Sequence, residues 1–527
     1  MCRKEVAVIK RKLKNLFKII FGRTMIVVLG LVLQIAVIAL AMSFFSDHFM
    51  YFSIVSAVLS TVVIVWIIND NTNPYYKLAW IVPVTLVPVF GTVTYLFAKL
   101  GLGTRIMNER ILQLIDETSP FIPQNEQTLK ELEEISVKEK NLAVYMKKYA
   151  GYPVWKNTYA EYYPIGEDAF ASMLRELENA KEFIFMEYFI VERGEMWNTI
   201  LDILVRKVKE GVDVRFMYDG MCSLLLVPYS YPKKLMAQGI KCKMFSPIKP
   251  VLSTVQNNRD HRKILVIDGH TAFTGGINLA DEYINKTVRF GHWKDNAVMI
   301  KGEAAAGFTI MFLQNWNITE YDSEDDYAKF IKQNFPELRE KSLRTDGFAL
   351  PYGDSPLDNE NVGQTVYLDI INRAEKYVHI MTPYLILDNE MTNALTYASK
   401  RGVDVAIIMP HVPDKIYAYL LARSYYAELI RSGVKIYEYT PGFVHSKAFV
   451  SDDIKAVVGS INLDYRSLFL HFECACYFYC HPVVAQVEED MRNTLKKCVQ
   501  ITLEDCKKYS LIKRLAGHLL RLFAPLM

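Results

Sequence analysis

A stretch of 18 residues occurs twice in this chain, and it restricts the possible folds more than any other feature. Residues 261–278 are HRKILVIDGHTAFTGGIN, and residues 445–462 are HSKAFVSDDIKAVVGSIN. Aligned without a gap, the two copies share His, Lys, Val, Asp, Ala, Gly, Ile and Asn at the same offsets. Most of these shared residues are polar or glycine, whereas a strand repeated only for its packing would keep its apolar residues. The repeat therefore predicts two copies that carry out chemistry together.

The duplication extends beyond this stretch. In the first half, FIFMEYFIV predicts a buried strand, and a helix that ends at Gly211 leads into a second strand, VDVRFMYD. The second half repeats this order with YVHIMTPYLIL, a helix and VDVAIIMP, and the tetrapeptide GVDV occurs in both halves. We therefore expect an α/β fold with two similar domains, at residues 152–320 and 350–500, joined by a charged linker at residues 321–349.

Apolar segments precede these domains. Residues 24–46 and 49–69 contain no charged side chain, and each is long enough to cross a hydrocarbon layer of about 30 Å as a helix. A third apolar segment, residues 78–98, contains two prolines and a glycine that would break or kink a helix. We expect that segment to be interfacial or re-entrant, so that residues 24–100 form a membrane anchor with two crossings.

The charges around the anchor predict its orientation. Residues 1–23 are basic, and Lys99, Arg105 and Arg110 follow the third apolar segment. Because basic flanks favour the cytoplasmic side, we expect the N-terminus and both domains in the cytoplasm and the chain in the plasma membrane.

Two further segments are expected to be helical. Residues 101–151 predict a charged helical connector, and residues 501–527 predict a basic amphipathic helix. The C-terminal helix is compatible with two positions, on the surface of an anionic bilayer or docked on its own domain.

The repeated stretch also predicts a site. In each copy the histidine and the lysine are two residues apart, so that on a strand they project from the same face. An aspartate closes each strand, and the returning strand ends in glycines, which let backbone N–H groups approach an anion. The candidate catalytic residues are His261, Lys263, Asp268, His445, Lys447 and Asp452. The candidate phosphate-binding residues are Gly275, Gly276, Asn278, Gly459, Ser460 and Asn462.

If the two domains pack about a pseudo-twofold axis, both copies contribute to one pocket with two imidazoles and two ammonium groups. An imidazole with a pKa of about 6.5 can act as nucleophile, acid or base at neutral pH. The lysines would neutralise the charge that develops on a pentacoordinate phosphorus. No His, Cys or carboxylate cluster with metal-ligand spacing accompanies them, so we expect neither a metal nor another cofactor. The pattern indicates phosphodiester transfer through a phosphohistidine.

Each histidine also needs a partner that orients its ring. Asp295 in HWKDNAVMI and Glu473 in LHFECACYF lie downstream of the two copies, on apolar runs where a lone carboxylate would be costly to bury. The alternative for each is a charge on an edge strand that faces water. The segment His292–Lys294 has the His-x-Lys spacing but lacks the aspartate and the glycine-rich tail, so we do not interpret it as a third copy.

These residues resemble the signature of the phospholipase D superfamily, His-x-Lys, four residues, Asp, six residues, Gly-Gly/Ser-x-Asn, at every position of both copies. The resemblance to one branch, the bacterial cardiolipin synthases, extends along the chain through NPYYKLAWIVPV, MEYFI, TPYLI and GSINLDYRSLFLHFE. That branch joins two phosphatidylglycerols and releases glycerol. By analogy, His261 would attack the phosphorus, and His445 would protonate the departing glycerol and then deprotonate the hydroxyl of the second phosphatidylglycerol. The pseudo-symmetry also permits the reverse roles.

Other functions stay open at the level of sequence. A phospholipase D that hydrolyses its substrate, or another phosphatidyltransferase, would carry the same signature, because water and a glycerol hydroxyl differ only in how the pocket admits them. A net charge of +3, without a broad basic surface interleaved with aromatic residues, argues against a nucleic-acid partner. An inactive membrane scaffold would be favoured by a missing His or Lys, and both copies are complete. We expect phosphatidylglycerol and anionic membrane lipid as partners; the sequence does not decide whether the chain forms a homo-oligomer.

Overall fold

The computed structural model describes residues 49–100, 102–224, 226–247, 257–319, 325–332, 345–358 and 360–526, together with isolated positions at 32, 35–37, 39, 40 and 335. The chain forms two compact units, an N-terminal unit that ends at Leu102 and a large unit that begins at Gly103. Each unit has a hydrophobic core of its own.

The N-terminal unit contains α3 (Phe49–Asn69), α4 (Pro74–Leu86) and α5 (Pro88–Leu100). Its core residues are Val63, Ile67, Val84 and Tyr95. The helical segment Met50–Asn69 is apolar and long enough to cross a membrane, as expected for the second span. The expected first span, residues 24–46, lies almost entirely outside the described residues.

The third apolar segment folds as two helices instead of one. α4 and α5 are separated at Val87, because Pro88 lacks an N–H group and disfavours a helical conformation at the preceding residue. Each helix has 13 residues and is therefore about 20 Å long, shorter than a hydrocarbon layer of about 30 Å. Gly91 allows the two helices to pack closely, since a Cβ atom there would lie 2.4 Å from the carbonyl oxygen of Pro83.

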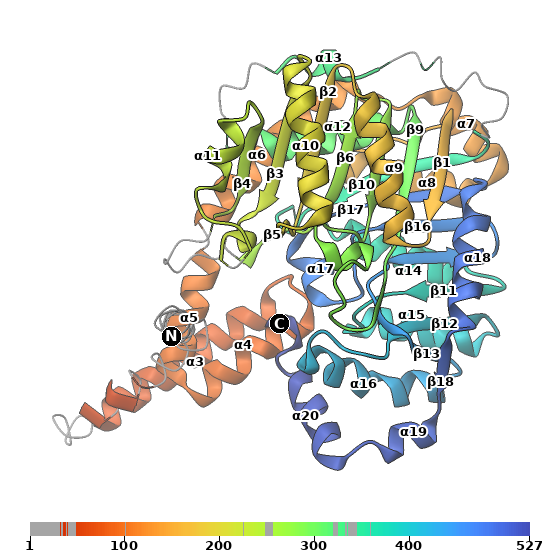
Figure 1. Ribbon diagram of the computed structural model, residues 1–527. Coiled ribbons are helices and arrows are strands. Elements are labelled where there is room, and N and C mark those ends of the chain that lie inside the picture. Colours follow the sequence, from red (N-terminus) through yellow and green to blue (C-terminus); the bar gives the residue numbers. More distant parts are fainter. Residues whose placement is uncertain are drawn as a thin grey trace, which may run out of the picture. The chain divides into compact units, whose positions relative to one another are not determined.

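The large unit contains two sheets with the same strand order (Figure 1). The sheet of the first repeat has the order β1-β9-β7-β6-β2-β3-β4, and the sheet of the second has the order β10-β17-β16-β15-β11-β12-β13-β18. In both sheets three parallel strands adjoin four antiparallel strands, and the second sheet carries one extra antiparallel edge strand. The predicted duplication of whole α/β domains is therefore confirmed.

The strands have these bounds. Those of the first sheet are β1 (Thr158–Tyr163), β2 (Phe183–Tyr188), β3 (Asp213–Asp219), β4 (Lys241–Phe245), β6 (Lys263–Ile267), β7 (Thr271–Gly275) and β9 (Ala297–Gly302). Those of the second are β10 (Phe348–Asp354), β11 (Tyr377–Met381), β12 (Asp404–Pro410), β13 (Lys435–Tyr439), β15 (Ala448–Ser451), β16 (Lys455–Gly459), β17 (His471–Tyr479) and β18 (Cys498–Ile501). Because β18 belongs to the second sheet, the second domain extends slightly past the expected limit at residue 500.

Two equivalent helices are shared between the repeats. α12 (Ala305–Trp316) packs on β2 and β6 of its own repeat and on β10 of the other, and α18 (Val483–Leu495) packs on β11 and β15 and on β1. The two repeats therefore share buried surface through these helices. The other helices of the repeats are α9 (Gly166–Asn179), α10 (Glu195–Lys209), α11 (Tyr231–Met236), α14 (Val362–Arg373), α15 (Asn389–Lys400), α16 (Ile416–Arg431) and α17 (Tyr465–Phe469).

Two short parallel strand pairs also join the repeats. They are β5 (Arg259–Asp260) with the start of β17, and β14 (Gly442–Val444) with β8 (His292–Lys294). β5 and β14 immediately precede His261 and His445, whereas β8 and the start of β17 lead directly to Asp295 and Glu473. Each histidine therefore lies beside the acid of the other repeat.

The connecting segments contain helices among their described residues. The expected connector at residues 101–151 contains α6 (Leu102–Thr118), α7 (Glu126–Ile135) and α8 (Val137–Tyr145), and the linker between the repeats contains α13 (Tyr327–Phe330). The chain ends with α19 (Leu503–Lys508) and α20 (Leu511–Arg521).

Candidate active site

His261 lies where the two repeats meet. Its Nδ1 atom is 2.9 Å from Oε1 and 3.0 Å from Oε2 of Glu473, on β17 of the second repeat. Both side chains are buried. Because a carboxylate accepts hydrogen bonds, Nδ1 carries the ring proton and Nε2 keeps a free lone pair.

His445 is held in the same way by the first repeat. Its Nδ1 atom is 2.7 Å from Oδ2 of Asp295. The Asp295 carboxylate also accepts hydrogen bonds from the backbone N–H of Asn296 at 2.9 Å and from the indole N–H of Trp293 at 3.4 Å. Burial raises the pKa of Asp295, but His445 and Lys447 outweigh it and hold that pKa below its ordinary value. Both expected acids thus contact a histidine, and each does so across the boundary between the repeats.

The two lysines lie beside the histidines of their own copies. The ammonium groups of Lys263 and Lys447 donate hydrogen bonds to the carbonyl oxygens of His261 and His445. Burial lowers the pKa of Lys263 to about 8, although Glu473 opposes this change. Burial also lowers the pKa of Lys447 to about 7.

Charged groups of both copies act on the pKa of each histidine. Burial lowers the pKa of His261 well below its ordinary value, and Lys263, Lys447 and His445 lower it further. Burial and Lys447 lower the pKa of His445 to about 4, although Asp295 opposes them. At neutral pH both imidazoles are therefore neutral, and each has an unprotonated Nε2 that can act as a nucleophile or a base.

The aspartates of the two copies bind main-chain groups, and their assignment to the catalytic group stays a prediction. The Asp268 carboxylate accepts hydrogen bonds from the backbone N–H groups of residues 181–183 at 2.8 to 2.9 Å. Asp452 accepts hydrogen bonds in the same way from residues 375–377. Their φ angles of 51° and 57° are left-handed, as the turn of a tight hairpin requires. Both aspartates close a hairpin and fix the start of the neighbouring strand.

The backbone groups expected to bind phosphate are used within the sheets. The N–H groups of Gly276 and Ser460 donate to carbonyl oxygens of the neighbouring strands at 2.9 and 2.8 Å. The glycines instead permit close approach, since a Cβ atom at Gly275 or Gly459 would lie 2.3 or 2.4 Å from a backbone oxygen of the adjacent strand. The N–H groups of Gly276 and Ser460 are therefore already occupied, and phosphate binding at these four positions stays a prediction.

The signature position that differs between the copies faces the two acids. A Cβ atom at Gly276 would lie 2.0 Å from Oδ1 of Asp295, so this position cannot carry a side chain without moving the acid. In the second copy the hydroxyl of Ser460 donates a hydrogen bond to Oε2 of Glu473. Gly276 and Ser460 thus support the orienting acids.

The two signature asparagines differ as well. Asn278 accepts a hydrogen bond from the backbone N–H of Ile190 at 3.1 Å and donates one to the hydroxyl of Tyr283 at 2.9 Å. Tyr283 in turn lies edge-on against the ring of His445, with centroids 5.5 Å apart. Asn462 is buried, and its Oδ1 atom has no hydrogen-bond partner among the described residues. The side-chain amide of Asn462 therefore makes fewer hydrogen bonds to the described residues than that of Asn278.

The sequence analysis missed His471, two residues before Glu473 on β17. The Nε atom of Arg466 donates a hydrogen bond to Nε2 of His471 at 3.0 Å. Since a guanidinium only donates, Nε2 is the acceptor and Nδ1 carries the proton. That N–H lies 3.6 Å from Oε1 of Glu473, and burial lowers the pKa of His471 to about 3, so the ring is neutral. The spacing of two residues on a strand, which places both side chains on one face, was the signal that could have identified it.

His261, His471 and Glu473 also offer atoms that could bind a metal, all within 4.8 Å of one another. Arg466 already occupies one ring nitrogen of His471. The cationic side chains of Lys263 and Lys447 act on His261, as their effect on its pKa shows, and would repel a metal ion. These contacts fit a hydrogen-bonded network better than a metal site.

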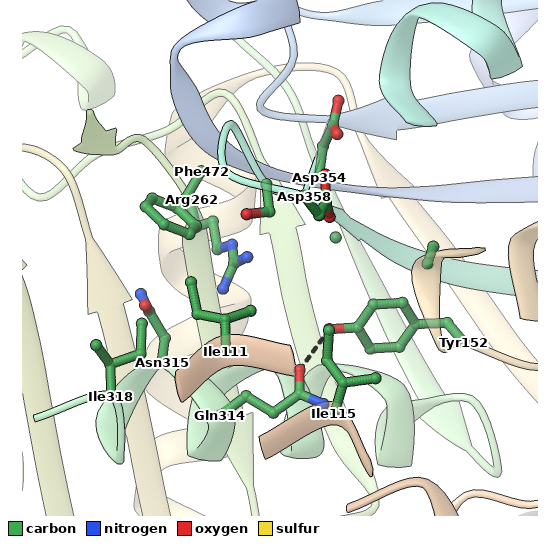
Figure 2. Close-up of a pocket in the computed structure, with 13 residues that line it drawn as sticks. Ile111, Ile115, Tyr152, Arg262, Gln314, Asn315, Ile318, Asp354, Asp358 and Phe472 are labelled. Atoms are coloured by element: carbon green, nitrogen blue, oxygen red, sulfur yellow. Dashed lines mark hydrogen bonds between the residues drawn. The ribbon is translucent and has the colours of Figure 1, made fainter. Parts of the chain in front are cut away.

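A small pocket with a cavity volume of about 40 Å³ is lined in part by the residue that follows His261, and it is shown in Figure 2. Arg262, Asp354 and Asp358 are among its lining residues, whereas no histidine lines it. Arg262 follows His261 and points to the opposite side of the extended chain. Its Nε atom donates a hydrogen bond to the carbonyl oxygen of Glu473 at 3.2 Å. Arg262 therefore supports the strand of Glu473 from the side away from the histidines.

Two histidine–acid pairs with adjacent lysines, built on a duplicated α/β sheet, define a phospholipase D-type enzyme. The family model described as cardiolipin synthase, PLD-like domain, matches residues 173–316 and 367–495, which is more than half of the chain. A second model, described as phospholipase D-nuclease N-terminal, matches residues 58–99. The chain therefore belongs to the cardiolipin synthase family of phospholipase D-type phosphatidyltransferases.

Relatives resemble this chain over most of its length. An uncharacterized protein of Streptococcus mutans is 47% identical over 464 residues, which cover 88% of this chain and 99% of the relative. A cardiolipin synthase of Alkalihalophilus pseudofirmus is 33% identical over 466 residues, covering 87% of this chain and 90% of the relative. A cardiolipin synthase of Clostridium perfringens is 33% identical over 461 residues, with coverage of 87% and 95%.

The fold resembles that of a solved structure. The crystal structure of phosphatidylserine synthase from Haemophilus influenzae Rd KW20 has a TM-score of 0.54, with 17% sequence identity, and covers 74% of this chain and 98% of that chain. At this identity the likeness concerns the fold.

Proposed function

We propose that this protein is a membrane-bound cardiolipin synthase that transfers a phosphatidyl group from one phosphatidylglycerol to another and releases glycerol. Relatives named cardiolipin synthase, matched over 87% of the chain, support this activity. The observation that carries the mechanism is the exchange of orienting acids between the repeats. This exchange supports a mechanism in which two imidazoles, each with an unprotonated Nε2 atom, act on one phosphorus atom.

In the first half-reaction, Nε2 of His261 attacks the phosphorus of the donor lipid. The bond between phosphorus and the glycerol oxygen breaks as the bond between phosphorus and nitrogen forms. His445 supplies the proton that the departing glycerol oxygen takes. The negative charge of the bound phosphodiester favours the protonated form of His445, and Asp295 stabilises the resulting imidazolium.

In the second half-reaction, His445 takes the proton from a glycerol hydroxyl of the second phosphatidylglycerol. The oxygen attacks the phosphorus, the bond to His261 breaks, and cardiolipin forms. Lys263 and Lys447 stabilise the charge on the phosphoryl oxygens in both steps. One phosphodiester replaces another, so that the free energy of the bond is retained without a nucleotide. The same residues would also serve with His261 and His445 exchanged.

The anchor supports a location in the plasma membrane. α3 is a candidate span, and the uncharged segment at residues 24–46 would supply a second. We propose that both cross the bilayer and that the α4–α5 pair lies at its interface. The basic flanks then place the large unit on the cytoplasmic side, beside anionic lipid. A protease added outside intact spheroplasts should leave the large unit uncut.

The test uses the purified full-length protein in mixed micelles with phosphatidylglycerol and a chelator. Lipid products and free glycerol are measured by mass spectrometry for the wild type, His261→Ala and His445→Ala. A matched control is His379→Gln, because Nδ1 of His379 also contacts a glutamate, Glu488 at 2.9 Å, which is not one of the acids paired with His261 or His445.

We expect equal amounts of cardiolipin and glycerol from the wild type and from the control, and neither product from the two alanine variants. Phosphatidic acid in place of cardiolipin would identify a hydrolase and contradict the proposal. Cardiolipin synthesis by either alanine variant at more than about 1% of the wild-type rate would contradict the shared two-histidine site, because removal of a nucleophile or of its acid–base partner typically costs a factor of about 10⁴ or more.

A further inference from the structure

The C-terminal helix α20 packs on α16 of the second repeat through Gly517 and Arg521. Gly517 lies against α16, where a Cβ atom would be 2.5 Å from the carbonyl oxygen of Leu420. Arg521 donates hydrogen bonds to the hydroxyl and the carbonyl oxygen of Ser424 at 2.9 and 2.7 Å. Its guanidinium also lies 3.9 Å from the ring centroid of Tyr425. A glycine and an arginine, not the leucines, therefore make the contacts that fix the helix.

Most of the large apolar side chains on α20 and directly after it are exposed. Between 48% and 80% of each side chain is exposed at Leu511, Ile512, Leu515, Leu519, Leu522 and Phe523. Residues four apart lie on one face of a helix, so that Leu511, Leu515 and Leu519 form a single stripe. A helix that served only to close its own domain would bury this stripe.

Cations flank the stripe. Lys507, Lys508, Lys513 and Arg514 are all exposed. No acidic residue occurs between Lys507 and Phe523. The combination of an exposed apolar stripe and a purely basic border matches the interface of an anionic bilayer, in which acyl chains lie beneath phosphate groups.

We propose that α20 is a membrane-docking helix that inserts its apolar stripe into the interface of an anionic bilayer while it stays attached to the second repeat. Its 11 residues span only about 16 Å, so it lies in the plane of the membrane and does not cross it. The chain carries an apolar helix long enough to span a bilayer, which supports lipid, and not a soluble protein, as the occupant of this surface.

Docking at α20 would also orient the active site. Gly517 faces Leu420 and Arg521 faces Ser424, so α20 packs directly on α16. α16 begins directly after Lys415, one of the charges that lower the pKa of His261. The surface that meets the lipid is thus connected to the histidine site through a single helix.

The first experiment is hydrogen–deuterium exchange on the full-length protein in nanodiscs of phosphatidylcholine with or without phosphatidylglycerol, and in detergent. Peptides that cover residues 511–522 should exchange at least about tenfold more slowly in discs with phosphatidylglycerol, because apolar insertion and cationic contacts each strengthen the bound state. The double variant Leu515→Glu/Leu519→Glu should lose this protection. The matched control is Ile135→Glu/Val137→Glu, two exposed apolar residues near the junction of α7 and α8.

The second measurement separates docking from chemistry. Leu515→Glu/Leu519→Glu and Lys513→Gln/Arg514→Gln should each raise the mole fraction of phosphatidylglycerol that gives half-maximal rate by about tenfold, because membrane binding weakens. Their kcat in detergent micelles saturated with substrate should match that of the wild type. The result concerns the surface alone and would hold even if the enzyme proved to be a hydrolase.

Three results would overturn the proposal. One is equal exchange at residues 511–522 in all three environments. Another is protection by phosphatidylglycerol that survives the double glutamate substitution. The third is protection in detergent that increases with protein concentration, since a second copy of the chain would then cover the stripe.

Discussion

The two histidine–acid pairs have the same geometry, but different groups contact the two acids. Nδ1 of His261 lies 2.9 Å from Glu473, and Nδ1 of His445 lies 2.7 Å from Asp295. Glu473 accepts a hydrogen bond from the hydroxyl of Ser460, and Nδ1 of His471 lies 3.6 Å from it, too far for a hydrogen bond. Asp295 is supported chiefly by the main chain, through the N–H of Asn296 at 2.9 Å. The signature residues of the two copies match closely, yet the groups around the two acids differ.

The difference follows from the length of the acid. Asp295 has the shorter side chain, and its carboxylate lies directly against the main chain at Gly276. Glu473 has one more methylene group, and the hydroxyl of Ser460 fills the corresponding space and donates a hydrogen bond. The one signature position that differs between Gly and Ser is thus matched to the acid beside it. A duplicated site can keep its reacting groups while the residues that hold them diverge.

The largest effect is expected from the acids themselves. Glu473→Gln and Asp295→Asn should each lower kcat by about 10²–10⁴-fold, because an amide can donate to Nδ1 and stabilise the wrong tautomer of the histidine. Initial rates at saturating phosphatidylglycerol measure this effect. If a variant retained more than one tenth of the wild-type rate, the histidine beside the substituted residue would not depend on that acid for its orientation.

The next prediction exchanges the residues that support the acids. Gly276→Ser should lower kcat by at least about 100-fold, since the new side chain displaces the Asp295 carboxylate by steric overlap. Ser460→Gly should lower it by only about tenfold, because it removes one hydrogen bond to a charged group. Product formation and the midpoint of thermal unfolding are measured for both. Equal losses would contradict the idea that each support is matched to its own acid.

The lysines predict the pH dependence. Each ammonium group is charged below its pKa, so kcat/KM should fall as the pH rises through about 7, the pKa of Lys447, and then about 8, that of Lys263. The decline for one required proton is about tenfold per pH unit. In the free enzyme both imidazoles are neutral throughout this range. The proton that His445 must take up before it acts as an acid therefore adds the same slope to the profiles of the wild type and of the lysine variant. Rates from pH 5 to pH 10 for the wild type and for Lys447→Arg test the assignment.

Lys447→Arg keeps its charge and should move the start of the decline from about pH 7 to about pH 8. A profile identical to that of the wild type would assign the decline to another group.

The smallest effects on kcat are expected for His471 and Trp293, which lie beside the two acids. His471→Phe should lower kcat about tenfold at an unchanged KM, because Glu473 loses a neighbouring N–H. His471→Gln should restore most of that loss, since its amide can accept from Arg466 and donate to Glu473. In the other half, Trp293→Phe should lower kcat only about twofold, because the indole N–H lies 3.4 Å from Asp295.

These variants are compared by kcat, KM and the midpoint of thermal unfolding. Equal activity of His471→Gln and His471→Phe, with a lowered unfolding midpoint for both, would assign His471 to packing alone.

Much of the architecture was predictable from local patterns. Alternating apolar strands and helices, and the recurrence of GVDV, predicted two α/β domains, and the structure has two sheets of equivalent strand order. The His-x-Lys spacing placed both side chains on one face of a strand, and the downstream acids Asp295 and Glu473 could be identified because a buried carboxylate needs a partner. The break at Pro88 was also foreseeable, because proline cannot continue the hydrogen bonding of the preceding helix.

The sequence by itself thus determined the duplicated fold and which side chains carry the chemistry, because strand periodicity and residue type are local properties. Only the tertiary structure decided that His261 pairs with Glu473, 212 residues away, and His445 with Asp295, 150 residues away. It also decided that the Asp268 carboxylate binds the backbone N–H groups of residues 181–183, which lie more than 80 residues earlier in the chain. These outcomes depend on the pairing of β5 with β17 and of β14 with β8. Such pairing joins segments far apart in the chain, and its specificity comes from the packing of two whole domains, which no short stretch of sequence encodes.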